Sequence, residues 1–115
     1  MDPRKLFGNR SERQAADFLL RKGYKIVARQ YKNRFGEIDL VARDGQEIVF
    51  VEVKARRTDA FGYPEESVTY KKLEKIAWVG ELFLQDRRWS NVSYRIDVVA
   101  IEPSGEFTHL IGVGG

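Results

Sequence analysis

The chain has no cysteine, and its only histidine is His109, close to the end. Without thiols there can be no disulfide framework, no zinc or iron–sulfur site with thiolate ligands and no cysteine nucleophile. With one histidine, a serine–histidine triad or a multi-histidine metal site is hard to build. These classes of protein are therefore excluded or disfavoured.

Long apolar runs, repeats and low-complexity linkers are also missing. Residues 1–20 carry charges throughout, unlike a secretory signal, and eighteen consecutive apolar residues occur nowhere. A chain of 115 residues is long enough for one modest core. We expect a soluble, cytoplasmic protein that forms a single domain over residues 1–115 and ends in a few flexible residues.

The net charge of +3 is unevenly distributed along the chain. Residues 1–36 have a net charge of +7, which leaves −4 for the remainder. A basic region of this kind suits a polyanion such as nucleic acid, through phosphate neutralisation and counterion release. From charge alone, a solvated basic surface explains the pattern equally well.

Hydrophobic periodicity predicts two helices and several strands. The first helix spans about residues 9–22; Ser11 with Gln14 offers one start, and Asp2 before Pro3 offers an earlier one. The second helix follows Thr69 as its N-cap. Strands are predicted at the following ranges: 24–31, 37–43, 46–55, 94–101 and, after a turn, 107–111. The order αβββαβ, with a final strand, implies an α/β domain whose mixed sheet is covered by two helices.

The two middle strands flank Asp44-Gly45, a dipeptide typical of a tight hairpin turn. A two-residue loop at these positions pairs residues whose numbers sum to 89, which makes Asp39 and Glu52 diagonal neighbours on one face. Lys54 shares that face, while the valines between these residues point to the other. A three-residue loop would reverse the faces.

Two neighbouring carboxylates need a cation. Lys54 is one candidate, and Mg²⁺, which takes oxygen ligands, is another. Glu12 adds a third acid, because it lies on the apolar stripe of the first helix. In the alternative interpretation, Asp39, Glu52 and Lys54 form a structural ion-pair network and Glu12 favours the helix dipole.

Two segments identify a family resemblance: Gly36-Glu37-Ile38-Asp39-Leu40 and Phe50-Val51-Glu52-Val53-Lys54-Ala55-Arg56. They resemble the YraN-like family of predicted endonucleases, within the PD-(D/E)XK nuclease superfamily, and are similar to archaeal Holliday-junction resolvases. Further matching residues extend the resemblance over nearly the whole chain: Gly8, Glu12, Ala15-Ala16, Gly23-Tyr24, Ser67-Val68-Thr69, Lys72 and Arg95-Ile96-Asp97-Val98-Val99. The proline that precedes the aspartate in the superfamily is replaced by Ile38. The resemblance implies an αβββαβ core like that of restriction endonucleases.

The resemblance also implies roles for individual residues. Asp39 and Glu52 match metal-binding acids, Lys54 matches the catalytic lysine, and Glu12 matches a helix-borne acid of the site. The backbone carbonyl of Val53 is a further candidate ligand, and Glu37 either supports the metal site or pairs with an arginine. Contacts to nucleic acid are expected from three basic residues: Arg56, Arg57 and Lys72.

The expected function is Mg²⁺-dependent hydrolysis of phosphodiester bonds in DNA, with Mn²⁺ as a substitute metal. Branched or structured DNA in repair, recombination or DNA uptake is the expected substrate. One alternative is a nucleic-acid-binding module or partner subunit with little activity of its own; another is a small protein with an ion-paired sheet. A homodimer and a partner protein that delivers the substrate are both compatible with so small a chain.

Two smaller expectations concern residues outside the acidic cluster. Arg95 and Asp97 are expected to form a structural pair within a buried strand. The aromatic side chains of Trp78, Phe83 and Trp89 are expected to pack in the core or at a helix end, and not to stack on bases.

Overall fold

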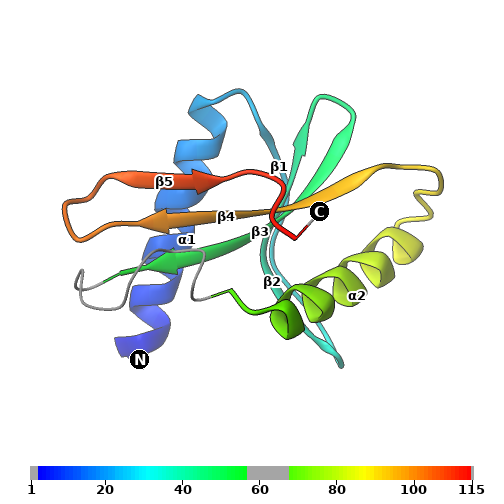
Figure 1. Cartoon of the computed structure of the whole chain (residues 1–115), viewed down its shortest axis with the longest axis horizontal. Helices are drawn as coiled ribbons and strands as arrows, with labels where there is room; N and C mark the ends of the chain where they lie inside the picture. The colour runs from blue at the N-terminus through cyan, green and yellow to red at the C-terminus, as the bar shows by residue number, and fades with distance from the viewer. Residues whose placement is uncertain (1–2, 57–67, 115) are drawn as a thin grey trace.

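The computed structural model describes residues 3–56 and 68–114, which form a mixed five-stranded sheet and two helices (Figure 1). The elements follow one another in this order: α1 (Pro3–Arg21), β1 (Lys25–Asn33), β2 (Gly36–Asp44), β3 (Glu47–Ala55), α2 (Tyr70–Asp86), β4 (Tyr94–Ile101) and β5 (Phe107–Leu110). This confirms the predicted αβββαβ order and the additional last strand. Within the described residues, neither helix is both long and apolar enough to cross a membrane.

Helix α1 begins at Pro3, the earlier of the two predicted starts. Proline suits the first turn of a helix, because its fixed φ is helical and the missing N–H would have no partner there. Ala15, Ala16 and Leu19 are fully buried, which confirms the apolar stripe. The helix ends before Gly23, whose φ of 94° lets the chain turn into β1.

Helix α2 begins after its predicted cap. The Lys72 amide donates a hydrogen bond of 3.1 Å to the Thr69 hydroxyl, which satisfies one free N–H of the first turn. One face of the helix is buried through Ile76, Val79 and Phe83. Because α2 connects β3 to the parallel strand β4, it is the crossover that the sequence order predicted.

In the part of the chain that the structure describes, the sheet has the strand order β1-β2-β3-β4-β5, and its only parallel pair is β3–β4. Its side chains alternate between two hydrophobic clusters. Val49 and Val51 belong to the cluster that includes Leu19 of α1, and Val53 packs against it. Phe50 belongs to the cluster that includes Phe83 of α2. The strand parity predicted from the sequence is therefore confirmed.

The register of the β2–β3 hairpin differs from the prediction by two residues. Asp44 pairs with Glu47, so that paired residue numbers sum to 91 and the loop is Gly45-Gln46. Gly45 has a φ of 61° and occupies the first central position, where a type II′ turn favours glycine. A shift of two residues leaves the side chains of the paired region, residues 40–44 and 47–51, on their predicted faces. The paired region ends at Leu40 and Val51, so Asp39 and Glu52 lie immediately beyond it.

The chain beyond β5 returns to β4. The Gly112 amide donates a hydrogen bond of 3.0 Å to the Asp97 carboxylate, and the Val113 amide donates one of 2.8 Å to the Ile96 carbonyl. These two contacts attach the residues after β5 to the middle of the neighbouring strand.

Candidate functional site

Three of the predicted acids meet where β2 and β3 diverge from their paired region. The Asp39 Oδ2 atom accepts a hydrogen bond of 2.8 Å from the Val53 amide. The carboxyl groups of Asp39 and Glu12 act on each other's ionisation, and the charge of Glu52 acts on both. Glu12 comes from α1 and the other two from the hairpin, so the fold brings together acids that are far apart in sequence.

Burial and mutual repulsion make this group unusual electrostatically. Desolvation, followed by the nearby charge of Glu52, raises the pKa of Asp39 to about 7, although the Val53 amide acts in the opposite direction. Desolvation also raises the pKa of Glu12, with smaller contributions from the charges of Glu37 and Glu52. With its pKa at about 7, the Asp39 carboxyl group holds its proton in acid and releases it near neutral pH.

An open cleft of about 300 Å³ gives access to the cluster. Its lining combines three acids with two lysines from the first turns of α2: Gly36, Glu37, Asp39, Glu52, Lys72, Lys75 and Ile76. Lys72 Nζ lies 2.7 Å from a Glu52 carboxylate oxygen. Acids and bases therefore share one water-accessible depression beside the N-terminal half of α2.

Among the described residues, the cation in contact with Glu52 is Lys72, which the sequence predicted only as a phosphate contact. Lys54 shares a sheet face with Glu52, as predicted, but it has no hydrogen bond or ion pair among the described residues. The interpretation of Asp39, Glu52 and Lys54 as one ion-pair network is therefore wrong for this structure. The Lys54 ammonium remains available to a ligand.

Two residues of the site were missed. Gln30 donates a hydrogen bond from Nε2 to the Glu12 carboxylate, and it does so from a strained backbone with a φ of 51°. No sequence signal reveals such a conformation in a β-strand. Lys75, by contrast, lies three residues after Lys72, and that spacing on a predicted helix puts both lysines on neighbouring positions.

The other predicted site residues lie around the cleft or outside it. Glu37 lines the cleft and, in the described part of the chain, has no ion pair with an arginine. Arg56 does not line it; its guanidinium lies 3.8 Å from Glu102. Arg57 lies outside the described residues. The Val53 backbone contributes an N–H to Asp39, while the predicted role of its carbonyl remains a prediction.

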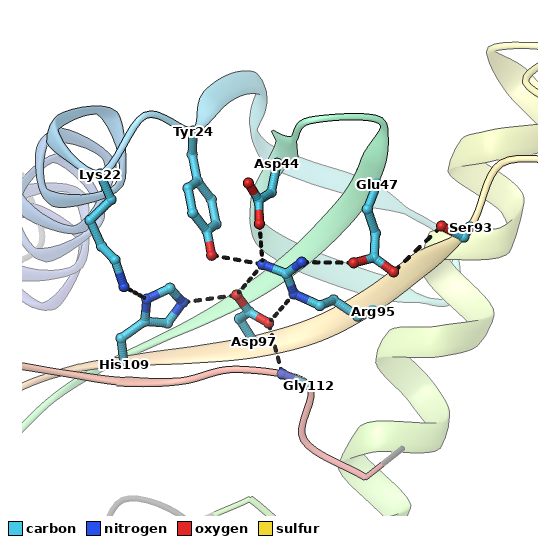
Figure 2. A network of polar contacts seen from close by, with 9 residues as sticks. All are labelled: Lys22, Tyr24, Asp44, Glu47, Ser93, Arg95, Asp97, His109 and Gly112. Carbon is cyan, nitrogen blue, oxygen red and sulfur yellow. Dashed lines mark hydrogen bonds and ion pairs between the residues drawn. The ribbon is translucent and has the colours of Figure 1, made fainter.

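A second polar cluster, on the α1 side of the sheet, is centred on Arg95 and the fully buried Asp97 (Figure 2). Arg95 Nε lies 3.0 Å from Asp97 Oδ1, which confirms the predicted pair. His109 Nε2 lies 2.8 Å from the other Asp97 oxygen, and Lys22 Nζ lies 2.7 Å from His109 Nδ1. Figure 2 shows these side chains converging between β4, β5 and the β2–β3 turn.

The second cluster is electrostatically satisfied, in contrast to the first. Burial acts to raise the pKa of Asp97, but hydrogen bonds from His109, Arg95 and Gly112 outweigh it and hold the pKa below its usual value. For Arg95, burial is likewise outweighed by its acidic partners, so its pKa is raised. A buried carboxylate with this many donors stabilises the fold and has little capacity left for a ligand.

The oxygen ligands offered by the acidic cluster of Glu12, Asp39 and Glu52 suit a hard cation. Among residues 3–56 and 68–114, no three acidic, histidine or cysteine side chains are grouped closely enough to form a metal site by themselves. Mg²⁺ does not require three, since it is commonly held by one or two carboxylates, water and substrate phosphate. Asp39 and Glu52 offer two carboxylates in an open cleft, and oxygen ligands suit Mg²⁺ and Mn²⁺.

Fold and site together define a small mixed α/β domain with an αβββαβ core and an acidic cleft flanked by lysines, an architecture consistent with a nuclease-like core. The family model described as "Uncharacterised protein family UPF0102" matches residues 11–101. The chain therefore belongs to family UPF0102, which confirms the YraN-like part of the resemblance.

Relatives in several bacteria carry the name UPF0102 protein. One from Caldicellulosiruptor saccharolyticus is 44% identical over 101 residues, covering 88% of this chain and 85% of the relative. One from Syntrophus aciditrophicus is 44% identical over 100 residues, covering 85% and 79%. A third, from Desulfosudis oleivorans, is 38% identical over 111 residues, covering 96% and 90%.

Proposed function

We propose that this protein is a metal-dependent endonuclease that hydrolyses phosphodiester bonds in DNA, as a member of the PD-(D/E)XK superfamily. The observation that carries the proposal is that Asp39 and Glu52 line one open cleft while Glu12, from α1, interacts with Asp39. Each occupies the position that the resemblance assigns to an acid of the site. A protein that needed only a stable sheet would have no use for three converging carboxyl groups with perturbed ionisation.

Asp39 and Glu52 would hold Mg²⁺, or Mn²⁺ in its place. When bound, the metal would supply charge neutralisation at the phosphate and an activated water. The Val53 amide fixes the orientation of Asp39 by donating to one of its oxygens. Gln30 does the same for Glu12, so that the acids are positioned before any ligand enters.

The lysines of the cleft would bind the phosphate groups. Lys72 and Lys75 lie on the first turns of α2, where the helix dipole also favours an anion. A phosphate that enters would compete with Glu52 for Lys72, which would release that carboxylate for the metal. Lys54 would orient the attacking water or neutralise the developing charge.

A second candidate is a nucleic-acid-binding module, or the partner subunit of a nuclease. Two observations favour it: the 2.7 Å ion pair between Lys72 and Glu52, and the absence of a three-ligand metal group in the described part of the chain. In that case the lysines would bind phosphate and the acids would only position them. The two candidates differ in whether the protein itself cleaves DNA and whether that cleavage requires Glu52.

A cleavage assay distinguishes the candidates. The parent protein and the Glu52→Gln variant are compared with Mg²⁺ or Mn²⁺ on single-stranded, duplex, flap and four-way-junction DNA. Glu106→Gln, which removes an exposed acid in the β4–β5 turn, is the matched control and reveals host nuclease contamination. Cleavage by the parent and the control that disappears in Glu52→Gln supports the nuclease. Junction binding without cleavage by any of the three proteins supports the binding module.

A further inference from the structure

Helix α2 carries a large aromatic side chain on its outside. Trp78 is 58% exposed, so the expectation that it packs in the core is wrong. The same expectation is confirmed for Phe83, which is fully buried, and for Trp89, whose ring packs edge-on against Phe83. An exposed tryptophan leaves much apolar surface in water and is a candidate contact for a ligand or partner.

Trp78 is one half of a stacked aromatic pair. Its ring lies 5.1 Å from that of Phe35, with an angle of 21° between the two planes. Phe35 therefore supports one face of the indole, and the exposure of Trp78 leaves the other face available to a planar partner. The guanidinium of Arg34 lies over the Phe35 ring at 4.8 Å, so the pair is bordered by a cation.

The aromatic pair adjoins the acidic cleft. Phe35 precedes Gly36, which lines the cleft, and a Cβ on Gly36 would lie 3.1 Å from Lys75 Cε. Lys75 also lines the cleft and comes one helical turn before Trp78. The turn between β1 and β2 and the middle of α2 therefore place Trp78 next to the proposed phosphate contacts.

The surroundings of Trp78 favour an anionic partner. Lys71, Lys75 and Trp78 are exposed and recur at helical spacing along α2, and Glu74 and Glu81 are exposed on the same side. Arg34 adds a cation over Phe35, so three cations and two acids surround the aromatic pair. Cations beside an accessible aromatic ring are the combination found where proteins bind single-stranded nucleic acid, since cations follow the phosphates and bases stack on rings.

We propose that Trp78, backed by Phe35, stacks against an unpaired base of the nucleic acid whose phosphate occupies the cleft; this inference rests on the proposed function. In a continuous duplex each base already stacks on its neighbours, so it cannot present a face to the indole. The platform therefore selects substrates with unpaired nucleotides beside the cleft, such as single strands, flaps and junctions with an open centre.

The two tryptophans of the chain allow a direct test by fluorescence. Trp89→Phe leaves Trp78 as the only reporter, and Trp78→Phe leaves Trp89. Both are titrated, in EDTA to prevent hydrolysis and at one salt concentration, with a short oligothymidylate and with a blunt duplex. We expect the oligothymidylate to quench the Trp89→Phe protein strongly and the Trp78→Phe protein hardly at all, with weak quenching by the duplex.

Binding of labelled oligothymidylate then measures the contribution of the ring. Trp78→Ala should weaken the affinity by about ten- to a hundred-fold, while binding of the blunt duplex changes little and Trp78→Phe retains part of the affinity. Tyr70→Ala removes another aromatic side chain of α2, 75% exposed, and should leave the affinity unchanged. Circular dichroism confirms that each variant is folded.

The inference is overturned if Trp78→Ala binds oligothymidylate as tightly as the parent, or if Trp78 fluorescence changes with protein concentration alone, which would indicate that a second copy covers the ring. Neither result affects the nuclease proposal, which depends on the Glu52→Gln comparison. Conversely, quenching by oligothymidylate in a protein that cleaves nothing retains the platform and removes the nuclease.

Discussion

Replacing Asp39 with asparagine tests the electrostatics of the acidic cleft through stability. In the folded protein the pKa of Asp39 is about 7, against an ordinary value of 3.8. As the pH rises through this interval the unfolded chain releases its proton first, so the folded state loses relative stability until about pH 7. A difference of about three pKa units corresponds to roughly 4 kcal/mol.

An asparagine side chain at this position would be uncharged at every pH, and its amide oxygen can still accept the Val53 hydrogen bond. We therefore expect Asp39→Asn to raise the free energy of unfolding by up to about 4 kcal/mol near pH 8 and by little near pH 4. Urea denaturation of parent and variant across this pH interval measures the effect. Asp17→Asn, which removes an exposed acid of α1, is the control and should follow the parent.

A cation adds a second arm to the same experiment. Mg²⁺ near pH 8 should raise the urea midpoint of the parent, because binding to the folded state stabilises it, and should have little effect on Asp39→Asn. Parallel pH profiles for parent and variant would refute the reasoning, since they would mean that Asp39 ionises alike in the folded and unfolded chains.

Two further predictions concern the fold. Gly80→Ala places a Cβ 2.3 Å from the ring of the fully buried Phe50, so we expect a loss of about 1–3 kcal/mol, seen as a lower Tm; an unchanged Tm would show that the ring can move aside. Asp97→Asn breaks a buried charge pair and should cost about 3–5 kcal/mol near neutral pH. Because the pKa of Asp97 is lowered, this stabilisation is fully present above the usual pKa and is lost as the pH falls through the lowered pKa of the folded state. A gap between parent and variant that persisted in strong acid would contradict the assignment.

The fold was largely predictable because each element has a local signal. Alternating valines marked β3, Thr69 marked the start of α2, and Gly45 marked the hairpin turn. The register was less certain, since a glycine can take either central position of a two-residue turn. The error of two residues preserved the faces of the paired region, and Asp39 and Glu52 still converged just beyond it.

The site was predicted less completely, because its contacts depend on long side chains and on backbone strain. From the sequence, Lys54 and Lys72 are both candidates to contact the acids. The position of α2 against the hairpin decides that Lys72 contacts Glu52. Gln30 was not predictable, since a φ of 51° inside a strand follows from the surroundings and not from the residue type. Trp78 was misjudged because helical periodicity places it beside buried positions.

Among residues 3–56 and 68–114, strand β1 lies at the edge of the sheet, and one row of its backbone groups has no neighbouring strand. Such an edge can pair with the same edge of another molecule and start aggregation. Three exposed basic residues on β1, Lys25, Arg29 and Lys32, repel a second copy, and the register irregularity between Ile26 and Ala28 interrupts the row. Part of the positive charge near the start of the chain therefore protects the folded molecule against self-association, whatever its partner.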